Sequence, residues 1–266
     1  MLCKISFAVG FSQRDDVTII KSEKMENLRN KTVGEIVKLD FRAADVFSSY
    51  GIDFCCGGKI SVADACAANG TDESKVISEL ESLQYKGGAA AHDFDSWKLD
   101  FLSDYIINTH HQYVKRAIPQ ILPLAQKVAE VHGDNHPETV KINDLFQDLA
   151  EELTSHLHKE EMILFPYIKK LVATEAAGGC DDGACFGTIA SPISVMEAEH
   201  ENAGVILKQM ELLSAGYTAP EDACNTFRVL YGKLKEFEAD LHVHIHLENN
   251  ILFPKAIELE QALLVD

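Results

Sequence analysis

The chain has 266 residues, of which 46% are hydrophobic and 25% charged, a composition that excludes disordered, collagen-like and small disulfide-scaffold proteins. Lys and Arg number 24 against 42 Asp and Glu, a formal net charge of −18. Charge of that sign repels phosphate, so we expect neither nucleic acid nor an anionic membrane as a partner. No apolar run approaches the ~20 residues that span a bilayer, and no convincing signal peptide is present. We therefore expect a cytoplasmic, reducing compartment, in which the seven cysteines are thiols or metal ligands.

Residues 1–28 precede the first clear helix signal and are interpreted as a disordered extension; a second methionine, Met25, lies near their end. Capping residues and glycine stops then predict three short helices, from Thr32 to Gly51, from Ser61 to Gly70 and from Thr71 to Gln84. They predict a small three-helix domain at residues 29–86. Its first loop is Asp53-Phe-Cys-Cys-Gly-Gly-Lys59, and residues 87–95 are interpreted as a linker.

Residues 96–266 carry four longer helical stretches. Pro119 and Pro123 predict a kink or a break in the first of them. Ser191 followed by Pro192 predicts the start of the third. No stretch alternates with a period of two, so we expect an all-α protein whose four long helices form an up-down-up-down bundle behind the small domain.

The strongest feature is an internal repeat at an offset of 88 residues. His156-Leu-His-Lys-Glu160-Glu-Met-Ile-Leu-Phe-Pro166 matches His244-Ile-His-Leu-Glu248-Asn-Asn-Ile-Leu-Phe-Pro254. A further histidine lies 45 residues before the first copy and 44 before the second, at positions 111 and 200. Two similar helical hairpins predict a bundle with pseudo-twofold symmetry.

Within each copy, the histidine and the glutamate are four residues apart and share one apolar helix face. A lone histidine on such a face is usually a hydrogen-bonded core residue, but a buried carboxylate without a partner is costly. Because the pattern occurs twice, it favours a metal site whose candidate ligands are His111, His156, Glu160, His200, His244 and Glu248. If both glutamates bridge two metals joined by an oxo or hydroxo ligand, each metal has five donors and one open position for O₂, NO or peroxide.

The other histidines are expected elsewhere. His158, His242 and His246 lie about 200° round the helix from a candidate ligand and are predicted to face solvent. His111 is preferred to its neighbour His110 because its helical neighbours are apolar. The remaining three lie in predicted linkers or loops and are expected at the surface: His92, His132 and His136.

Two carboxylates are candidates for a supporting role. Glu152 lies one turn before His156, and Glu199 directly precedes His200. Either could orient an imidazole or relay protons, and a surface carboxylate is an equally open interpretation for both.

These motifs together resemble the iron-sulfur cluster repair di-iron proteins, the repair of iron centres family, over about residues 31 to 258. The resemblance implies a hemerythrin-like bundle with a non-haem di-iron centre held by the six residues above, in a protein that restores iron-sulfur clusters after nitric oxide or peroxide stress. Damaged iron-sulfur proteins would be its partners, and a homodimer is left open. Alternatives are an O₂ or NO binding or sensing module, an NO reductase, and a di-metal oxidase or peroxidase.

Of the seven cysteines, Cys3, Cys66 and Cys224 are interpreted as incidental or packing residues, and the other four form two pairs. Cys55 and Cys56 lie in the glycine-rich turn, where backbone amides could lower a thiol pKa, and redox exchange or transient capture of iron or NO is their functional interpretation. Packing in a structural turn is the alternative. Cys180 and Cys185 lie in a glycine-rich segment and are interpreted as incidental thiols, with a redox pair or metal handle as the alternative.

Overall fold

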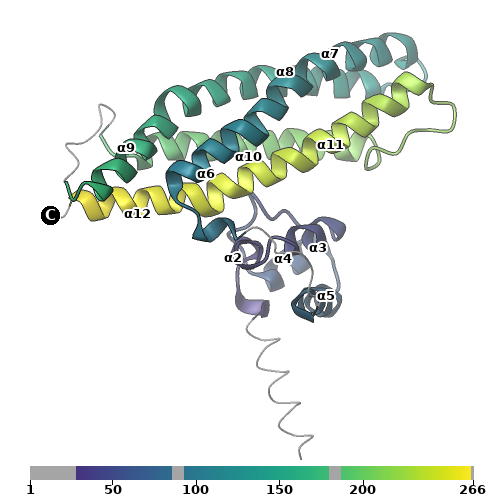
Figure 1. Ribbon diagram of the computed structural model, residues 1–266. Helices are drawn as coiled ribbons and strands as arrows, with labels where there is room; N and C mark the ends of the chain where they lie inside the picture. Colours follow the sequence, from purple (N-terminus) through teal and green to yellow (C-terminus); the bar gives the residue numbers. More distant parts are fainter. Residues whose placement is uncertain (1–27, 86–92, 180–186, 265–266) are drawn as a thin grey trace, which may run out of the picture.

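The computed structural model describes residues 28–85, 93–179 and 187–264, and these ranges are almost entirely helical. Their β-type pairing is limited to one bridge between Thr32 and Ser61. Four long helical columns lie side by side, and a small helical unit packs below their middle (Figure 1). The expected all-α architecture, a four-helix bundle preceded by a small helical domain, is therefore confirmed. Within the described ranges no helix is both long and apolar enough to cross a membrane.

Between residues 33 and 85 the small unit is built from α2 (Val33–Leu39), α3 (Ala43–Ser49), α4 (Val62–Asn69) and α5 (Glu73–Tyr85). The predicted capping box is present, because the Thr32 hydroxyl accepts from the backbone N–H of Glu35 and the Glu35 carboxylate accepts from that of Thr32. The single helix expected up to Gly51 is instead divided. Asp40 has extended backbone, and its carboxylate accepts from the backbone N–H and the side chain of Arg42. That local bonding competes with the helix and ends it.

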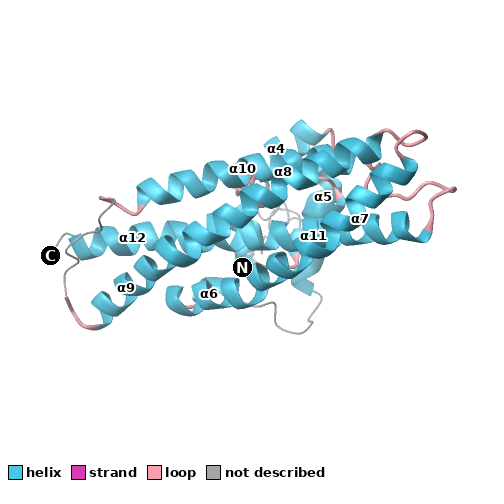
Figure 2. Cartoon of the chain, turned by 90° about the horizontal axis from the view of Figure 1, so that it is seen from above, coloured by secondary structure: helices cyan, strands magenta, loops and turns pink. Residues whose placement is uncertain are grey.

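The bundle is built from segmented helices. Its first column is α6 (Leu99–Ile106), the π turn η2 (Ile107–His111) and α7 (Gln112–His132). The second is α8 (Glu138–Lys159), the π turn η3 (Glu160–Leu164) and α9 (Phe165–Ala176). The third is α10 (Ala190–Leu213), and the fourth is α11 (Asn225–Leu247), the π turn η4 (Glu248–Leu252) and α12 (Phe253–Leu264). α7 contacts α8 and α11, and α8 also contacts α10, which joins the four columns of the bundle seen from above in Figure 2.

Two expected helix boundaries differ from the structure. α7 runs through Pro119 and Pro123, so the first column is interrupted at the π turn η2 and not at the prolines. α10 begins one residue before Ser191, and its first turn is held by Glu260, which accepts from the backbone N–H of Ile189. Residues 1–27 of the expected extension, residues 87–92 of the expected linker at 87–95, Cys180 and Cys185 lie outside the described residues. The end of that linker is not free, because it enters the short 3-10 helix η1 (Phe94–Ser96), in which Phe94 is buried.

The π turns show how closely the two halves of the bundle correspond. η3 and η4 begin and end at positions 88 residues apart, and so do the helices α9 and α12 that follow them. A π turn inserts one residue into a helix, and such insertions occur frequently at functional sites. In this chain both insertions begin at the glutamate of the repeat.

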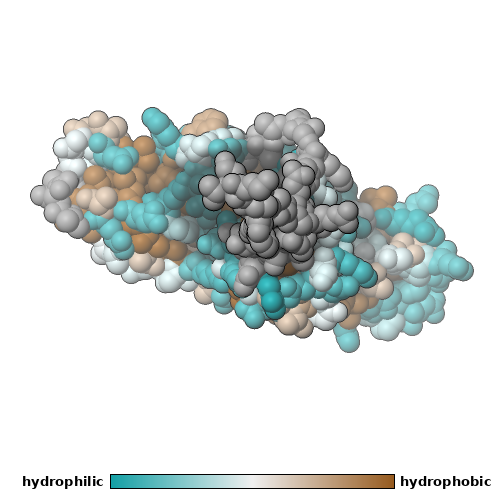
Figure 3. Space-filling model, turned by 90° about the horizontal axis from the view of Figure 1, so that it is seen from below, coloured by the Kyte–Doolittle hydropathy of each residue, from teal (hydrophilic) through white to brown (hydrophobic). Residues whose placement is uncertain are grey.

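The hydrophobic core does not stop at the edge of the small unit. One apolar cluster includes buried residues of both the small unit and the bundle, and a second fills the end of the bundle that carries α9 and α12. α2 approaches η4 so closely that a side chain on Gly34 would overlap Asn250. Viewed from below, apolar surface gathers toward the end with the C-terminus, and the remaining coloured surface is mainly hydrophilic (Figure 3).

Candidate metal centre

The six candidate ligands meet inside the bundle. They come from all four columns, and each is at most 2% exposed: His111 at the end of η2, His156 on α8, Glu160 at the start of η3, His200 on α10, His244 on α11 and Glu248 at the start of η4. Their donor atoms form two groups, and both glutamates belong to both groups. The sequence repeat therefore corresponds to a site with two halves.

In the first half, the Nε2 atoms of His111 and His244 lie 3.1 Å apart. His111 Nε2 is 3.4 Å from a Glu160 oxygen, and His244 Nε2 is 2.9 Å from a Glu248 oxygen. Two imidazoles and two carboxylates thus point their donor atoms at one small volume. This arrangement suits iron, manganese or zinc, which all accept such nitrogen and oxygen donors.

The second half has the same composition. The Nε2 atoms of His156 and His200 lie 3.0 Å apart. His156 Nε2 is 3.3 Å from a Glu160 oxygen, and His200 Nε2 is 3.2 Å from a Glu248 oxygen. The two halves share Glu160 and Glu248, and each half could hold a metal ion.

The electrostatics of the buried carboxylates also favour a metal site. Both oxygens of Glu160 and one of Glu248 are buried without a hydrogen-bond partner among the described residues. Burial alone would raise the pKa of Glu248, but the imidazoles of His244, His111 and His200 hold it well below its usual value. Burial lowers the pKa of His156, but the carboxylates of Glu160, Glu248 and Glu199 together outweigh burial and raise that pKa to about 9. Such a set demands positive charge at its centre, which a metal pair supplies.

Three of the imidazoles also make a hydrogen bond through Nδ1, on the side of the ring that faces away from the centre. His111 Nδ1 lies 2.8 Å from a Glu161 oxygen, and His156 Nδ1 lies 2.7 Å from a Glu199 oxygen. His200 Nδ1 lies 2.8 Å from the side-chain oxygen of Asn249. With Nδ1–H donated outward, Nε2 is free to face the centre, which is the usual arrangement of a ligating histidine.

Aromatic rings cover the upstream histidines. The Phe165 ring stacks on His111 at 5.6 Å between centroids, and the Phe253 ring stacks on His200 at 6.0 Å. Both phenylalanines directly follow a π turn and are fully buried. They restrict the rotation of the rings and shield the site from water.

Of the two expected supporting carboxylates, the structure brings one to the site. Glu199 contacts His156, whereas Glu152 is exposed and accepts from Asn202 at 2.6 Å. Sequence reasoning missed Glu161 and Asn249. A signal existed, because each directly follows a glutamate of the repeat.

One expectation about the remaining histidines is wrong. His246 is fully buried, and its ring packs against Phe41 and Phe54 of the small unit. Burial lowers its pKa to about 4. The small unit covers the face of α11 that points away from the metal ligands. It does not cover the corresponding face of α8, and there His158 is exposed, as expected. His242 is also half-buried, against the Phe54 ring.

Three further histidines lie near carboxylates or a thiol. His110 is buried at 4% exposure, and its Nδ1 lies 3.0 Å from an Asp240 oxygen. His132 and His136 are only partly exposed rather than fully at the surface. His92 lies outside the described residues.

The cysteine loop packs against α10 and η4. The thiol of Cys55 donates to Asp53 at 3.0 Å, and the thiol of Cys56 donates to the backbone carbonyl of His200 at 3.3 Å. The expected effect of the backbone amides is absent, because those of Cys55, Cys56 and Gly57 donate to the Asp53 carboxylate and not to a thiol. Hydrogen bonding to Cys56 and burial instead raise the pKa of Cys55.

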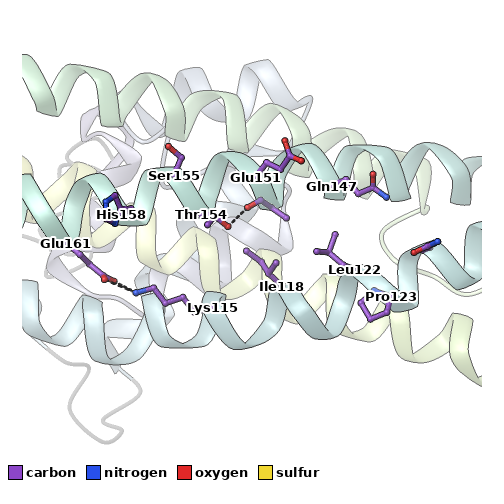
Figure 4. Close-up of a pocket in the computed structure, with 12 residues that line it drawn as sticks. Lys115, Ile118, Leu122, Pro123, Gln147, Glu151, Thr154, Ser155, His158 and Glu161 are labelled. Carbon is purple, nitrogen blue, oxygen red and sulfur yellow. Dashed lines mark hydrogen bonds and ion pairs between the residues drawn. The ribbon is translucent and has the colours of Figure 1, made fainter.

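A groove between α7 and α8 reaches the rear of the site (Figure 4). One end of the groove carries the ion pair of Lys115 with Glu161, at 2.7 Å, and Glu161 in turn contacts His111. His158 lines the same groove. The groove therefore brings solvent to the outer partner of one candidate ligand.

The comparisons with known proteins agree with this site. The model of the hemerythrin HHE cation-binding domain matches residues 103–256, and a domain of unknown function, DUF542 or ScdA_N, matches residues 29–84. The iron-sulfur cluster repair protein YtfE of Yersinia pseudotuberculosis is 36% identical over 235 residues, 87% of this chain and 99% of the relative. YtfE of Yersinia pestis has the same identity and coverage.

The chain belongs to the family of iron-sulfur cluster repair proteins. The resemblance stated from the motifs is thus confirmed, and so is the presence of a hemerythrin cation-binding domain. For this family member the buried His and Glu groups provide a site that could hold metal.

Proposed function

We propose that this chain is a di-iron protein that repairs iron-sulfur clusters damaged by nitrosative or oxidative stress. The observation that carries the proposal is the pair of buried His₂Glu₂ groups that share Glu160 and Glu248. The names of the Yersinia relatives support repair as the purpose of such a site. We further propose a cytoplasmic location, damaged iron-sulfur proteins as partners, and NO, O₂ or peroxide as small ligands.

In this proposal the chain's own residues have distinct tasks. The four imidazoles and two carboxylates hold two irons, which would supply an exchangeable coordination position and one-electron chemistry. Glu199 accepts the Nδ1 proton of His156 and so orients that ring. Phe165 and Phe253 keep water from the buried face of the site.

Cys55 and Cys56 are proposed as a redox or iron relay between the site and a partner. The position of the two thiols supports this role, because Cys56 contacts the backbone of His200 and the two sulfurs lie 3.8 Å apart. With Asp53 they form a third group of donor atoms that could hold a metal ion transiently. Because Cys55 is buried, a partner would reach Cys56 first.

The test has two arms on the purified full-length protein. Metal analysis should find about two irons per chain, as the six-residue set requires. Anaerobic incubation with an NO-damaged iron-sulfur enzyme should restore that enzyme's activity, while a parallel incubation with NO and a reductant is followed for N₂O. Recovery without N₂O supports repair by iron delivery, whereas N₂O without recovery would replace repair by NO reduction.

Variants locate the site. His156→Leu and Glu248→Leu should each lose iron and repair together, because each removes a donor from the shared centre. His158→Leu, matched to His156→Leu but exposed, should keep both. If the ranking is reversed, the assignment of the helix faces is wrong.

A further inference from the structure

The sequence repeat allows the two halves of the candidate metal centre to be compared residue by residue. We call the pair His156 and His200 with the shared glutamates the 156/200 half, and the pair His111 and His244 the 111/244 half. The repeat relates His156 to His244 at an offset of 88 residues. The upstream ligands His111 and His200 are 89 residues apart and correspond by their place, one in each half. A symmetric centre would give each related pair the same outer hydrogen bond.

Three of the four imidazoles have such an outer partner. The contacts of the upstream histidines are related by the repeat, because the partner in each case directly follows a shared glutamate. The three bonds are those of His111 with Glu161, His200 with Asn249 and His156 with Glu199. Both members of the 156/200 half are therefore supported.

The fourth imidazole breaks the symmetry. The residue directly before the upstream ligand is Glu199 in one repeat and His110 in the other. His110 lies beside His244 with the two rings nearly parallel, 5.7 Å between centroids. Its own Nδ1 bonds to Asp240, so it offers His244 no acceptor there. Nδ1 of His244 is fully buried and finds no hydrogen-bond partner in the part of the chain that the structure describes.

We propose that the 111/244 half holds its metal more weakly than the 156/200 half, so that one iron leaves first and leaves from the 111/244 half. The inference rests on the proposed dinuclear centre and specifies which part of it releases metal. An outer acceptor fixes the ring and makes the imidazole a better donor, and its loss typically weakens metal binding about 10- to 100-fold. His110 is thus a positioning residue whose identity sets the order of release.

The experiment uses the full-length diferrous protein with ¹⁵N-labelled histidine. One equivalent of iron per chain is withdrawn anaerobically with the chelator ferrozine, and the imidazole nitrogens are followed by NMR. We expect the signals of His111 and His244 to return to metal-free positions while those of His156 and His200 keep their paramagnetic shifts. Loss from the 156/200 half first, or equal loss from both, would overturn the inference.

Two variants test the cause independently. In His110→Gln the amide oxygen can accept from His244 while the amide nitrogen donates to Asp240, as Asn249 already accepts from His200. The preference between the halves should then fall by about 10-fold or more. Glu199→Leu should also remove the difference in metal affinity between the halves, because it weakens metal binding by the 156/200 half.

The exposed His158→Gln is the control and should release iron in the wild-type order. An unchanged order in a folded His110→Gln protein overturns the assigned cause. Should that variant not fold, an unchanged order in Glu199→Leu overturns it equally. The dinuclear centre is tested separately, because a wild-type protein that binds one metal only in the 156/200 half would contradict two-iron binding while agreeing with the proposed difference between the halves.

Discussion

The thiol of Cys56 donates a hydrogen bond to the backbone carbonyl oxygen of His200, with 3.3 Å between sulfur and oxygen. The same loop is fixed to η4, because the side-chain amide of Asn250 donates to the carbonyl oxygen of Cys55 at 3.4 Å. One turn beyond His200, Gly204 also lies against this sulfur, because a Cβ at that position would be in van der Waals contact with it at 3.5 Å. The cysteine loop is therefore a neighbour of the metal-binding helices, although 144 residues separate Cys56 from His200 and 195 separate Cys55 from Asn250.

The first prediction concerns the thiols. Cys55→Ser combined with Cys56→Ser should leave the iron content unchanged and abolish repair of a damaged iron-sulfur protein. A serine hydroxyl can still donate to the His200 carbonyl, but it cannot take part in thiol redox chemistry or bind soft metal ions well. Metal analysis and the recovery assay measure the two effects. Full repair by the double variant would mean that the loop is only structural, and loss of iron would mean that it supports the metal site directly.

The second prediction compares two positions related by the repeat. His246→Glu should lower the free energy of unfolding by about 3 kcal/mol or more, because it places a carboxylate against Phe41 and Phe54 with no counter-charge. His158→Glu, 88 residues earlier and exposed, should change it by less than about 0.5 kcal/mol. Chemical denaturation of both proteins is the measurement. Equal effects would contradict the burial of His246 by the small unit.

The third prediction concerns a buried carboxylate remote from the metal centre. Glu260 is 2% exposed and accepts from Tyr167, Thr188 and the backbone N–H of Ile189. Glu260→Ala should cost about 2–4 kcal/mol, because it leaves these donors unpaired and frees the start of α10. Glu258→Ala, exposed on the same helix, is the matched control. Thermal unfolding that ranks both variants alike would show that Glu260 is not an anchor.

The fourth prediction is a pH dependence at Cys224. Hydrogen bonding from the backbone N–H of Phe227 and from His132 lowers the pKa of this exposed thiol to about 7. Because the thiolate is the reactive form, alkylation should rise as pH increases through about 7 and then level off. His132→Ala should move the midpoint toward the ordinary thiol value. Iodoacetamide labelling with peptide mapping measures it, and Cys66, whose pKa burial raises, should react slowly at the same pH. A midpoint near 9 in the wild type contradicts the prediction.

Helical periodicity was sufficient to predict which residues come together at the centre. Residues four apart share a face, so the pairing of His156 with Glu160 and of His244 with Glu248 followed from spacing alone. Spacing does not predict what covers the other face of a helix. His246 was therefore expected in solvent, whereas packing of the small unit buries it.

The π turns and the division of the first small helix could not be predicted from the sequence pattern either. A single inserted residue hardly changes the apolar periodicity, so η3 and η4 appeared as ordinary helix. The break after Leu39 depends on the side chain of Asp40 bonding to Arg42, which is a choice between two local structures of similar energy. That the six residues bind iron stays a prediction.

The matching boundaries of η3 and η4 have an evolutionary consequence. A chain half this length, assembled as a symmetric dimer, would have to carry the same residue at each of two related positions. Once the two halves are joined in one polypeptide, a substitution in one half leaves the other unchanged. His110 and Glu199 differ in this way. Fusion of a duplicated hairpin thus gives each side of a shared metal centre its own mutational history.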